Sequence, residues 1–296
     1  MSVPAHPYRV VANHNARVLV QNADFKQQFC VPRRRHGLLV AGDWVDLDHM
    51  PNGDAAIRSV APRSSLLERP NRTGTLKPVA ANLTQLVIVA AIEPGIQTHL
   101  IDSYCVAAER AGIQPTIAIN KADLHKDERL EEIEQLIEIY RNIGMHCVLC
   151  KSKETDGVDA LAHLLANNTS ALVGQSGVGK SSIVNALLPR ESVRTGALSQ
   201  ASGQGSHTTS TTTLYNLPSG GELIDSPGVR EFTPHVPDSS ELAHAFREFY
   251  EYARQCRFAN CLHLNEPGCA VKIAVESHLI APSRYASYLD MLNPER

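Results

Sequence analysis

The stretch Gly174-Gln175-Ser176-Gly177-Val178-Gly179-Lys180-Ser181 has the spacing GxxxxGK[ST] of a phosphate-binding loop. An apolar run of strand length, residues 170–173, precedes it, and residues 181–188 have the pattern of a helix. In such a loop the glycines let backbone N–H groups turn inward around a phosphate, and the helix directs its positive end at the same anion. Lys180 is expected to reach the β- and γ-phosphates and assist catalysis, and Ser181 to bind Mg²⁺. The stretch predicts an α/β domain that binds a nucleotide, without indicating which one.

A second motif, Asn120-Lys121-Ala122-Asp123, concerns the base. It follows an apolar run at residues 114–119, so it lies at the carboxyl end of a predicted strand, where open α/β sheets bind ligands. The Asp123 carboxylate can accept hydrogen bonds from guanine N1–H and N2–H₂, a donor pair that adenine lacks. Asn120 can support the loop and contact the purine, and the Lys121 stem can cover the base face. By itself the motif could be a polar loop capped by Asp123, but beside the phosphate loop it predicts a guanine nucleotide.

The order of these motifs is unusual. The base-reading motif Asn120–Asp123 comes before the phosphate loop, and Asp225-Ser226-Pro227-Gly228 follows it. Ordinary GTPases run from the phosphate loop through DxxG to NKxD. Asp225 is expected to hold Mg²⁺ through water, and the Gly228 N–H to contact the γ-phosphate. The chain therefore contains the parts of a guanine-nucleotide site in circularly permuted order.

The segment 191–213 is rich in Gly, Ser and Thr and is expected to become ordered around a ligand. Within it, Thr209 is preferred narrowly over Thr208 as the residue that completes the Mg²⁺ shell. Ras-like enzymes place a water-orienting Gln directly after the DxxG glycine, but this chain has Val229, which cannot orient water. His207 is the candidate replacement, since an imidazole can accept a proton from water or position it. The alternative is a loop histidine that only packs or hydrogen-bonds.

The residues between the two nucleotide motifs predict a helix at 131–143 and a strand at 146–150. Lys151-Ser152-Lys153 then takes the position of the SAK-like loop of GTPases, where the backbone N–H of Ser152 would contact guanine O6, although the residue types match poorly. The strand contains Cys147 and Cys150, whose offset of three places the thiols on opposite faces. Two buried cysteines are therefore expected here rather than a metal or redox site.

The first 65 residues predict a small β-barrel, because polar and apolar residues alternate in five short runs. The runs are residues 8–12, 16–20, 28–31, 42–47 and 56–60. Residues 1–80 contain eleven Lys and Arg against six Asp and Glu, and Arg33-Arg34-Arg35-His36 lies between two strands. This basic loop is an equally good candidate for contact with a phosphate backbone and for a solvated loop that keeps the barrel soluble.

The carboxy-terminal part contains Cys256-x₄-Cys261-x-His263-x₅-Cys269, four residues of metal-binding type. Three thiolates and one imidazole form a closed tetrahedral set suited to Zn²⁺, with no position left for a substrate. The ion is expected to be structural, holding a small helical domain that could not bury enough core alone. Chance clustering of buried cysteines is the alternative.

Composition limits the possible classes of protein. The chain has 296 residues, 43% hydrophobic and 20% charged, with a formal net charge of −3, so the whole molecule is not a polybasic nucleic-acid binder. No apolar stretch reaches membrane-spanning length, no signal-peptide pattern is present at the N-terminus, and seven cysteines favour a reducing cytoplasm. The expected division is a barrel at 1–65, a linker at 66–82, a nucleotide domain at 83–232 and a helical zinc domain at 233–296.

This combination resembles one family, the circularly permuted GTPases called ribosome small-subunit-dependent GTPase A, or RsgA/YjeQ-type proteins. The matching stretches are Asn120–Asp123, Gly174–Ser182, Gly205–Thr209, Asp225–Phe232 and the set Cys256, Cys261, His263 and Cys269 followed by Ala270-Val271-Lys272. The resemblance implies a multidomain chain with an N-terminal OB-type β-barrel that binds RNA, a central α/β GTPase domain and a C-terminal helical zinc-binding domain. The family's proposed catalytic histidine falls on His207.

The resemblance also implies an activity and partners. It implies hydrolysis of GTP to GDP, stimulated by the small (30S) ribosomal subunit and its 16S rRNA, and a role in late maturation of that subunit. One structural Zn²⁺, Mg²⁺ bound with GTP or GDP, a cytoplasmic monomer and no membrane contact are expected. An alternative is a GTP-gated rRNA-binding module with little turnover, which Val229 favours for the isolated chain. Asp123 argues against a third possibility, a kinase or ATPase with a phosphate loop.

Overall fold

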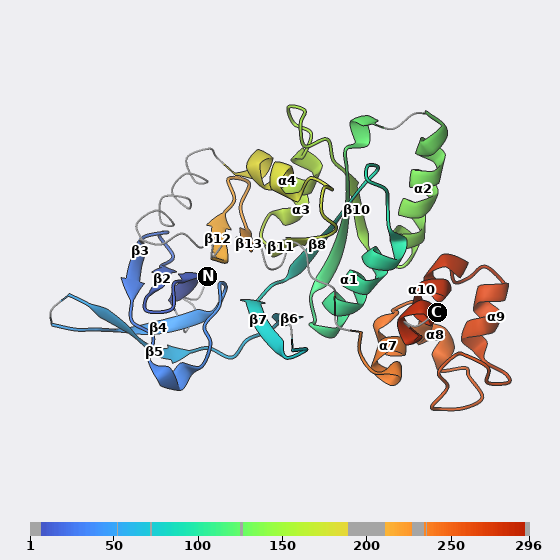
Figure 1. Cartoon of the computed structure of the whole chain (residues 1–296), viewed down its shortest axis with the longest axis horizontal. Coiled ribbons are helices and arrows are strands. Elements are labelled where there is room, and N and C mark those ends of the chain that lie inside the picture. The colour runs from blue at the N-terminus through green and yellow to red at the C-terminus, as the bar shows by residue number, and fades with distance from the viewer. Residues whose placement is uncertain are drawn as a thin grey trace.

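The computed structural model describes residues 7–51, 53–71, 73–124, 127–188, 211–226, 234 and 236–293. Figure 1 shows three regions along the chain: a barrel of N-terminal strands, a central sheet flanked by helices, and a group of short helices at the C-terminal end. Several predicted residues lie outside the described ranges, so what the sequence predicts for them stays a prediction: His207, Thr208, Thr209, Gly228 and Val229.

The central sheet has the strand order β10-β9-β8-β11-β13-β12. Its strands are β8 (Gln85–Ala91), β9 (Gln114–Asn120), β10 (His146–Leu149), β11 (Thr169–Val173), β12 (Thr213–Asn216) and β13 (Glu222–Asp225). All are parallel except β12, which is antiparallel to β13. Every residue of β8 is buried, as expected for a parallel strand covered on both faces.

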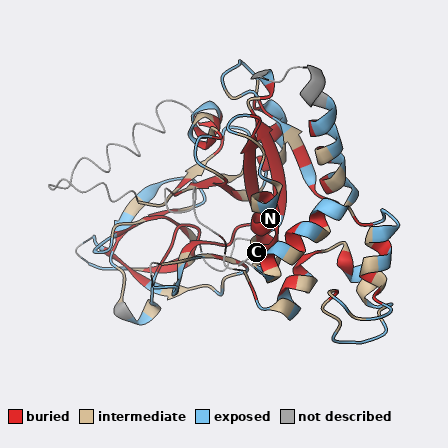
Figure 2. Cartoon of the chain, turned by 45° about the vertical axis from the view of Figure 1, so that its right-hand side comes forward, coloured by how far each residue is buried: buried red, intermediate tan, exposed pale blue. Residues whose placement is uncertain are grey.

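Helices cover both faces of this sheet. They are α1 (Thr98–Arg110), α2 (Asp127–Asn142), α3 (Asp159–Leu165) and α4 (Lys180–Leu187). Ile88 of β8 faces the core under α1 and α2, and Val89 faces the core under α3 and α4. Cys147 belongs to the first core and Cys150 to the second, which confirms the predicted pair of buried cysteines on opposite faces. Figure 2 shows the central strands buried, while the flanking helices carry exposed faces.

The N-terminal strands form the predicted barrel. They are β1 (Tyr8–Asn13), β2 (Val18–Gln21), β3 (Gln27–Cys30), β4 (Trp44–His49) and β5 (Ala55–Val60). β1 pairs with β2 and β4, β2 with β3, and β4 with β5, while a bridge between Val31 and Ala56 connects β3 to β5. Val10, Val20 and Ile57 fill the interior. The ring is therefore closed by main-chain pairing on every side.

The segment predicted as a linker, residues 66–82, is a β-hairpin in the structure. It consists of β6 (Leu66–Pro70) and β7 (Leu76–Ala81), which pair antiparallel. The Asn71 side chain holds the turn by accepting hydrogen bonds from the backbone N–H groups two and four residues later, both at 2.9 Å. Leu67 reaches the core under α1 and α2. The polar turn gives the segment a linker-like composition, so the two flanking strands could not be recognised from composition.

The barrel joins the edge of the central sheet directly. β1 pairs with β12, with Ala12 opposite Thr213. The Arg9 side chain, 3% exposed, pairs with Glu222 at 2.8 Å, and its guanidinium lies over the Trp44 ring, 4.6 Å from the centroid. A continuous path of paired strands therefore runs from the central sheet into the barrel and gives the barrel a defined position.

The C-terminal region is helical, as predicted. Its helices are α7 (Ser239–Ala245), α8 (Phe249–Ala253), α9 (Ala270–Glu276) and α10 (Pro282–Leu292). Asp238 caps α7 by accepting two backbone N–H groups of its first turn. Phe246, Phe249 and Tyr288 form an aromatic core that also contains Val106 of α1. None of the helices in the described part of the chain has the length and apolar character needed to cross a membrane.

Candidate nucleotide site and metal centre

The three nucleotide motifs start from one edge of the central sheet. β9 ends at Asn120, β11 leads into the phosphate loop after Val173, and β13 ends at Asp225. These strands are parallel and lie close together in the order β9-β8-β11-β13. Because parallel strands end at the same edge, the permuted motifs lie together there, although up to about a hundred residues separate them in the chain.

The phosphate loop has a backbone that only glycine permits at two positions. Gly174 has φ 141°, and a Cβ there would lie 2.1 Å from the carbonyl oxygen of Val89. Gly179 has φ 94°, and a Cβ there would lie 2.3 Å from Nδ2 of Asn120. A side chain at either position would push the loop away from β8 or from the base-reading motif. The glycines therefore set how closely the phosphate loop approaches its neighbours.

Lys180 begins α4 and is 5% exposed. Its ammonium donates hydrogen bonds to the carbonyl oxygens of Gly174, at 2.8 Å, and Gln175, at 2.5 Å, so the charge lies inside the loop. Ser181 and Ser182 follow in the first turn of α4, at the positive end of the helix dipole. The N-cap residue of α4 is Gly179, so no side chain covers this end of the helix from that position. This combination of N–H groups and an ammonium fits a phosphate group.

Asn120 links the base-reading motif to two other loops. The residue is fully buried. Its Nδ2 donates to the carbonyl oxygen of Val178 in the phosphate loop at 2.9 Å, and its Oδ1 accepts from the backbone N–H of Ser152 at 3.2 Å. The sequence predicts that Asn120 supports the loop, and the structure identifies which segments it holds. Ser152, predicted from its position alone, lies beside the motif, and its contact with guanine stays a prediction.

The other two base-reading residues are Lys121, which is half-buried, and Asp123, which is exposed. Lys121 has φ 58°, and its Nζ donates to the carbonyl oxygen of Glu93 at 2.7 Å. Asp123 lies in the 3-10 turn η2 (Ala122–Leu124) and is exposed, so its carboxylate is open to a ligand. Sequence reasoning missed the contact with Glu93. No sequence signal could have shown it, because every residue type offers the same backbone carbonyl.

We expect Asn120→Ala to weaken guanine-nucleotide binding roughly tenfold, because a buried polar group that loses its partner costs about 1–3 kcal/mol. The change removes the partner of the Val178 carbonyl and of the Ser152 N–H. Titration of a fluorescent GDP analogue gives the dissociation constant. Asn142→Ala, at the exposed end of α2, is the control. An unchanged dissociation constant for Asn120→Ala would contradict the bridging role.

Asp225 lies at the end of β13, next to the strand that leads into the phosphate loop. Ser226, the following residue, is 3% exposed, and its hydroxyl accepts a hydrogen bond from the Thr212 hydroxyl at 2.7 Å. This hydrogen bond from Thr212 therefore holds the end of β13 in place. The water-mediated contact of Asp225 with Mg²⁺ stays a prediction, as do the roles of Thr209 and Gly228.

The basic loop of the barrel contains the 3-10 turn η1 (Arg34–His36). Arg33 pairs with Asp48 at 2.7 Å, which compensates its charge. Arg35 donates instead to the carbonyl oxygen of Arg58 at 2.9 Å, a contact that leaves its positive charge in place. Within this loop, Arg35 is therefore a better candidate than Arg33 for contact with a phosphate backbone.

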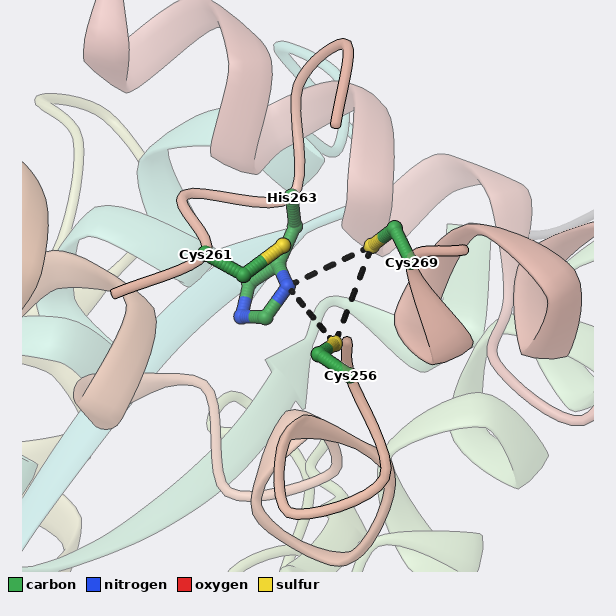
Figure 3. A group of neighbouring side chains, drawn as sticks. All are labelled: Cys256, Cys261, His263 and Cys269. Carbon is green, nitrogen blue, oxygen red and sulfur yellow. Dashed lines mark hydrogen bonds between the residues drawn. The ribbon is translucent and has the colours of Figure 1, made fainter. Parts of the chain in front are cut away.

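The predicted metal ligands come together between α8 and α9. Figure 3 shows the three thiols and the imidazole directed toward one another, and the ligand atoms of Cys256, Cys261, His263 and Cys269 all lie within 4.8 Å. His263 Nδ1 is 3.7 Å from Cys256 Sγ and 3.4 Å from Cys269 Sγ, and these sulfurs are 4.0 Å apart. A tetrahedral ion with Zn–S of about 2.3 Å and Zn–N of about 2.0 Å separates its ligands by about 3.5–3.8 Å. The group therefore has the donors and the size to bind one metal ion.

Neighbouring side chains hold the ligand loop. The hydroxyls of Tyr285 and Tyr288 donate to the carbonyl oxygens of His263 and Leu262, both at 2.6 Å. Glu266 accepts from the backbone N–H of Leu262 at 2.8 Å, and although burial opposes its charge, N–H groups of the loop hold the pKa of Glu266 below its ordinary value. Burial lowers the pKa of His263, which favours the neutral imidazole that binds metals.

Comparisons with known proteins agree with this architecture. The model of the RsgA GTPase family matches residues 60–235. A small ribosomal subunit biogenesis GTPase RsgA from Chromohalobacter salexigens is 46% identical over 268 residues, which cover 90% of this chain and 78% of the relative. A protein of the same name from Pseudomonas aeruginosa is 43% identical over 289 residues, which cover 98% of this chain and 85% of the relative.

Two solved structures share the fold over almost the whole chain. YjeQ from Thermotoga maritima superposes with a TM-score of 0.81 at 32% identity, covering 98% of each chain. YloQ, a circularly permuted GTPase, gives a TM-score of 0.78 at 29% identity, covering 99% of this chain and 97% of the other. The family match contains the base-reading motif, the phosphate loop and the Asp225 motif in their permuted order. By fold, motif order and sequence identity, the chain belongs to the RsgA GTPase family.

Proposed function

We propose that this protein hydrolyses GTP to GDP and phosphate on the small (30S) ribosomal subunit and thereby assists late maturation of that subunit. The observation that carries the proposal is that the permuted motifs lie together in space. Asn120 forms hydrogen bonds with Val178 of the phosphate loop and with Ser152. Family membership supports GTP hydrolysis. The names of the relatives from Chromohalobacter salexigens and Pseudomonas aeruginosa support the ribosomal role.

In the proposed site, different side chains meet different parts of GTP. Asp123 selects guanine, and the Lys121 stem covers the base. Lys180 and the N–H groups at the start of α4 compensate the charge of the phosphates. They also compensate the charge that develops while the γ-phosphoryl group is transferred to water. Ser181, Thr209 and Asp225 hold Mg²⁺, directly or through water, and the Gly228 N–H contacts the γ-phosphate. When bound, Mg²⁺ supplies further charge compensation to the phosphate oxygens.

The metal, the domains and the partners complete the proposal. Zn²⁺ is the proposed ion of the Cys₃His group, in a structural role, because the protein fills all four positions. Residues 1–65 are the proposed RNA-binding barrel, with the Arg33–His36 loop toward 16S rRNA. Residues 83–232 are the proposed GTPase domain and residues 233–296 the zinc domain. The protein is proposed to act as a cytoplasmic monomer.

We expect His207→Ala to lower 30S-stimulated GTP turnover about 10²-fold, the usual effect of losing one acid–base group. Affinity for GTP should stay within about threefold, because His207 makes no ground-state contact in this mechanism. His163→Ala, an exposed histidine of α3, is the control. The measurements are turnover rates with and without 30S subunits. Equal falls in both rates would show that His207 already acts in the free protein, and no fall would remove it from the mechanism.

Titration of GTP turnover with purified 30S and 50S subunits tests the proposal as a whole. We expect 30S subunits to raise turnover at least tenfold, since ordering one catalytic group contributes about 10²–10⁴-fold. We expect 50S subunits to leave it nearly unchanged. Binding to 30S without stimulation would instead support a GTP-gated rRNA-binding module. Effective competition by ATP for the GTP site would contradict the assigned base specificity.

A further inference from the structure

A buried group of charges joins the C-terminal helices to the nucleotide domain. Arg284 of α10 is 2% exposed, and it pairs with Asp102 of α1 at 2.5 Å and with Glu248 at 2.6 Å. Burial alone would lower the pKa of Arg284, but Asp102 and Glu248 raise it well above its ordinary value, so the guanidinium stays charged. Arg284 and Asp102 are 182 positions apart, and neither belongs to a motif.

Asp102 also connects the two helices that flank the base-reading motif. Its Oδ1 accepts a hydrogen bond from the Tyr140 hydroxyl of α2 at 2.7 Å. α2 is the helix that follows Asp123 along the chain. α1, which carries Asp102, follows the loop in which the Glu93 carbonyl holds Lys121 Nζ at 2.7 Å. The Asp102 side chain therefore connects the helix that follows the Glu93 loop with the helix that follows Asp123 in the chain.

Helix α10, which carries Arg284, also contacts the loop of the candidate metal ligands. Tyr285 and Tyr288, on the same helix, donate to the carbonyl oxygens of His263 and Leu262 in the ligand loop, both at 2.6 Å. Glu248, the other partner of Arg284, immediately precedes α8, and α8 leads to Cys256. Helices α7 and α10 contact α1, beside which Figure 1 shows them. A short chain of contacts thus runs from the metal ligands through Arg284 to Asp102.

Helix α1 also borders the phosphate loop. Leu100 of α1 lines a small cavity together with Gly174 and Val178 of the phosphate loop. Asp102 and Val106 of the same helix contact the C-terminal helices. A shift of α1 would therefore change its contacts at the nucleotide site and at the C-terminal helices together.

Stability alone does not account for this group. Replacing a buried ion pair with apolar packing is often neutral or stabilising, whereas removing one partner leaves a buried charge uncompensated. The surrounding core already supplies apolar contacts, through Phe246, Phe249 and Tyr288. The distinct contribution of the ion pair is geometric, because a guanidinium between two carboxylates accepts a narrow range of orientations.

We propose that Asp102 and Arg284 are positioning residues for nucleotide binding, which hold the base-reading loop through α1 and α2 and tie its geometry to the metal-bound C-terminal domain. The inference rests on the proposed guanine-nucleotide site and adds a route by which a partner bound to the C-terminal domain changes nucleotide affinity. By thermodynamic linkage, the bound nucleotide changes affinity for that partner equally.

The test is the rate at which the full-length, zinc-loaded chain releases a fluorescent GDP analogue, without ribosomes. Asp102→Asn keeps the shape of the side chain but removes the charge opposite Arg284. We expect release to be about fivefold faster, the lower end of typical coupling between sites. Arg284→Lys should change the rate in the same direction. The matched control is Glu109→Gln, on the same helix and the same interface, because its pair with Arg247 is partly exposed whereas the pair of Asp102 with Arg284 is almost fully buried.

Zinc content and melting temperature separate positioning from loss of fold. A purely structural role would lower the melting temperature of Asp102→Asn without changing release from the folded, zinc-loaded protein. If that variant does not fold, Tyr140→Phe takes its place, since it removes only the hydroxyl bonded to Asp102. A change smaller than about threefold in the folded variants overturns the inference, because it lies below typical coupling. Failure of the wild-type chain to bind the GDP analogue would instead overturn the proposed function.

Discussion

Asp123→Asn should switch the base preference of the protein from guanine to xanthine. The amide keeps the shape of the side chain but replaces one acceptor oxygen with a donor, which would face a guanine N–H. One lost charge-assisted hydrogen bond and one mismatch should cost about 2–4 kcal/mol of GTP affinity. Xanthosine triphosphate presents a carbonyl at that position and should bind the variant better than GTP does. Because Asp123 is exposed, the fold should tolerate the change.

Competitive titration of GTP and xanthosine triphosphate, against wild type and variant, measures this exchange. Asp159→Asn, an exposed carboxylate of α3, controls for the loss of one negative charge and should keep the preference for GTP. If Asp123→Asn still prefers GTP about tenfold, which is about 1.4 kcal/mol, another residue reads the base.

Cys261→Ser should release the metal and unfold the C-terminal region. Structural zinc contributes about 10–16 kcal/mol of apparent binding free energy in small domains, so opening the tetrahedron removes most of what holds the ligand loop. Helices α7 to α10 are short, and the longest has 11 residues, so they depend on packing around that loop. Guanine-nucleotide binding should survive, because the nucleotide motifs end at Gly228. Release should become faster, as the link through Arg284 and Asp102 requires.

Metal analysis and hydrogen exchange of the purified variant measure both effects. We expect zinc to fall from about one per chain to near zero, with loss of amide protection in α7 to α10. Cys147→Ser is the control, since this buried cysteine lies in β10, outside the ligand group, and zinc should be retained. Full protection of these helices in zinc-free wild-type protein would contradict a structural role for the metal.

The nucleotide domain could be predicted from the sequence because its signals are local. A phosphate loop needs glycines at fixed spacing, and Gly174 and Gly179 have positive φ and close neighbours that no other residue would fit. β8 could be recognised as a strand because its apolar residues face a core on each side of the sheet. The cluster of four residues able to bind a metal ion could be predicted for the same reason, since their spacing and chemistry lie within one short segment.

Contacts between distant segments could not be predicted in this way. The hairpin at 66–82 has a polar turn, and its strands are recognisable only once Leu67 is seen to pack against the central domain. The pairing of β1 with β12 depends on two edge strands that meet after folding. The sequence offered no sign of either, because any backbone can pair and composition does not identify the partner.

The sequence by itself determined the motif order, the candidate base, phosphate and metal residues, and the alternation of the barrel strands, because each depends on local spacing and side-chain chemistry. Only the tertiary structure decided that Asn120 bridges two loops, that the barrel continues the central sheet, and that Arg284 pairs with Asp102. A polar side chain has the same chemistry whatever its partner. Its partner is set by the packing of helices and strands that bring distant positions together, and that packing is a property of the whole chain.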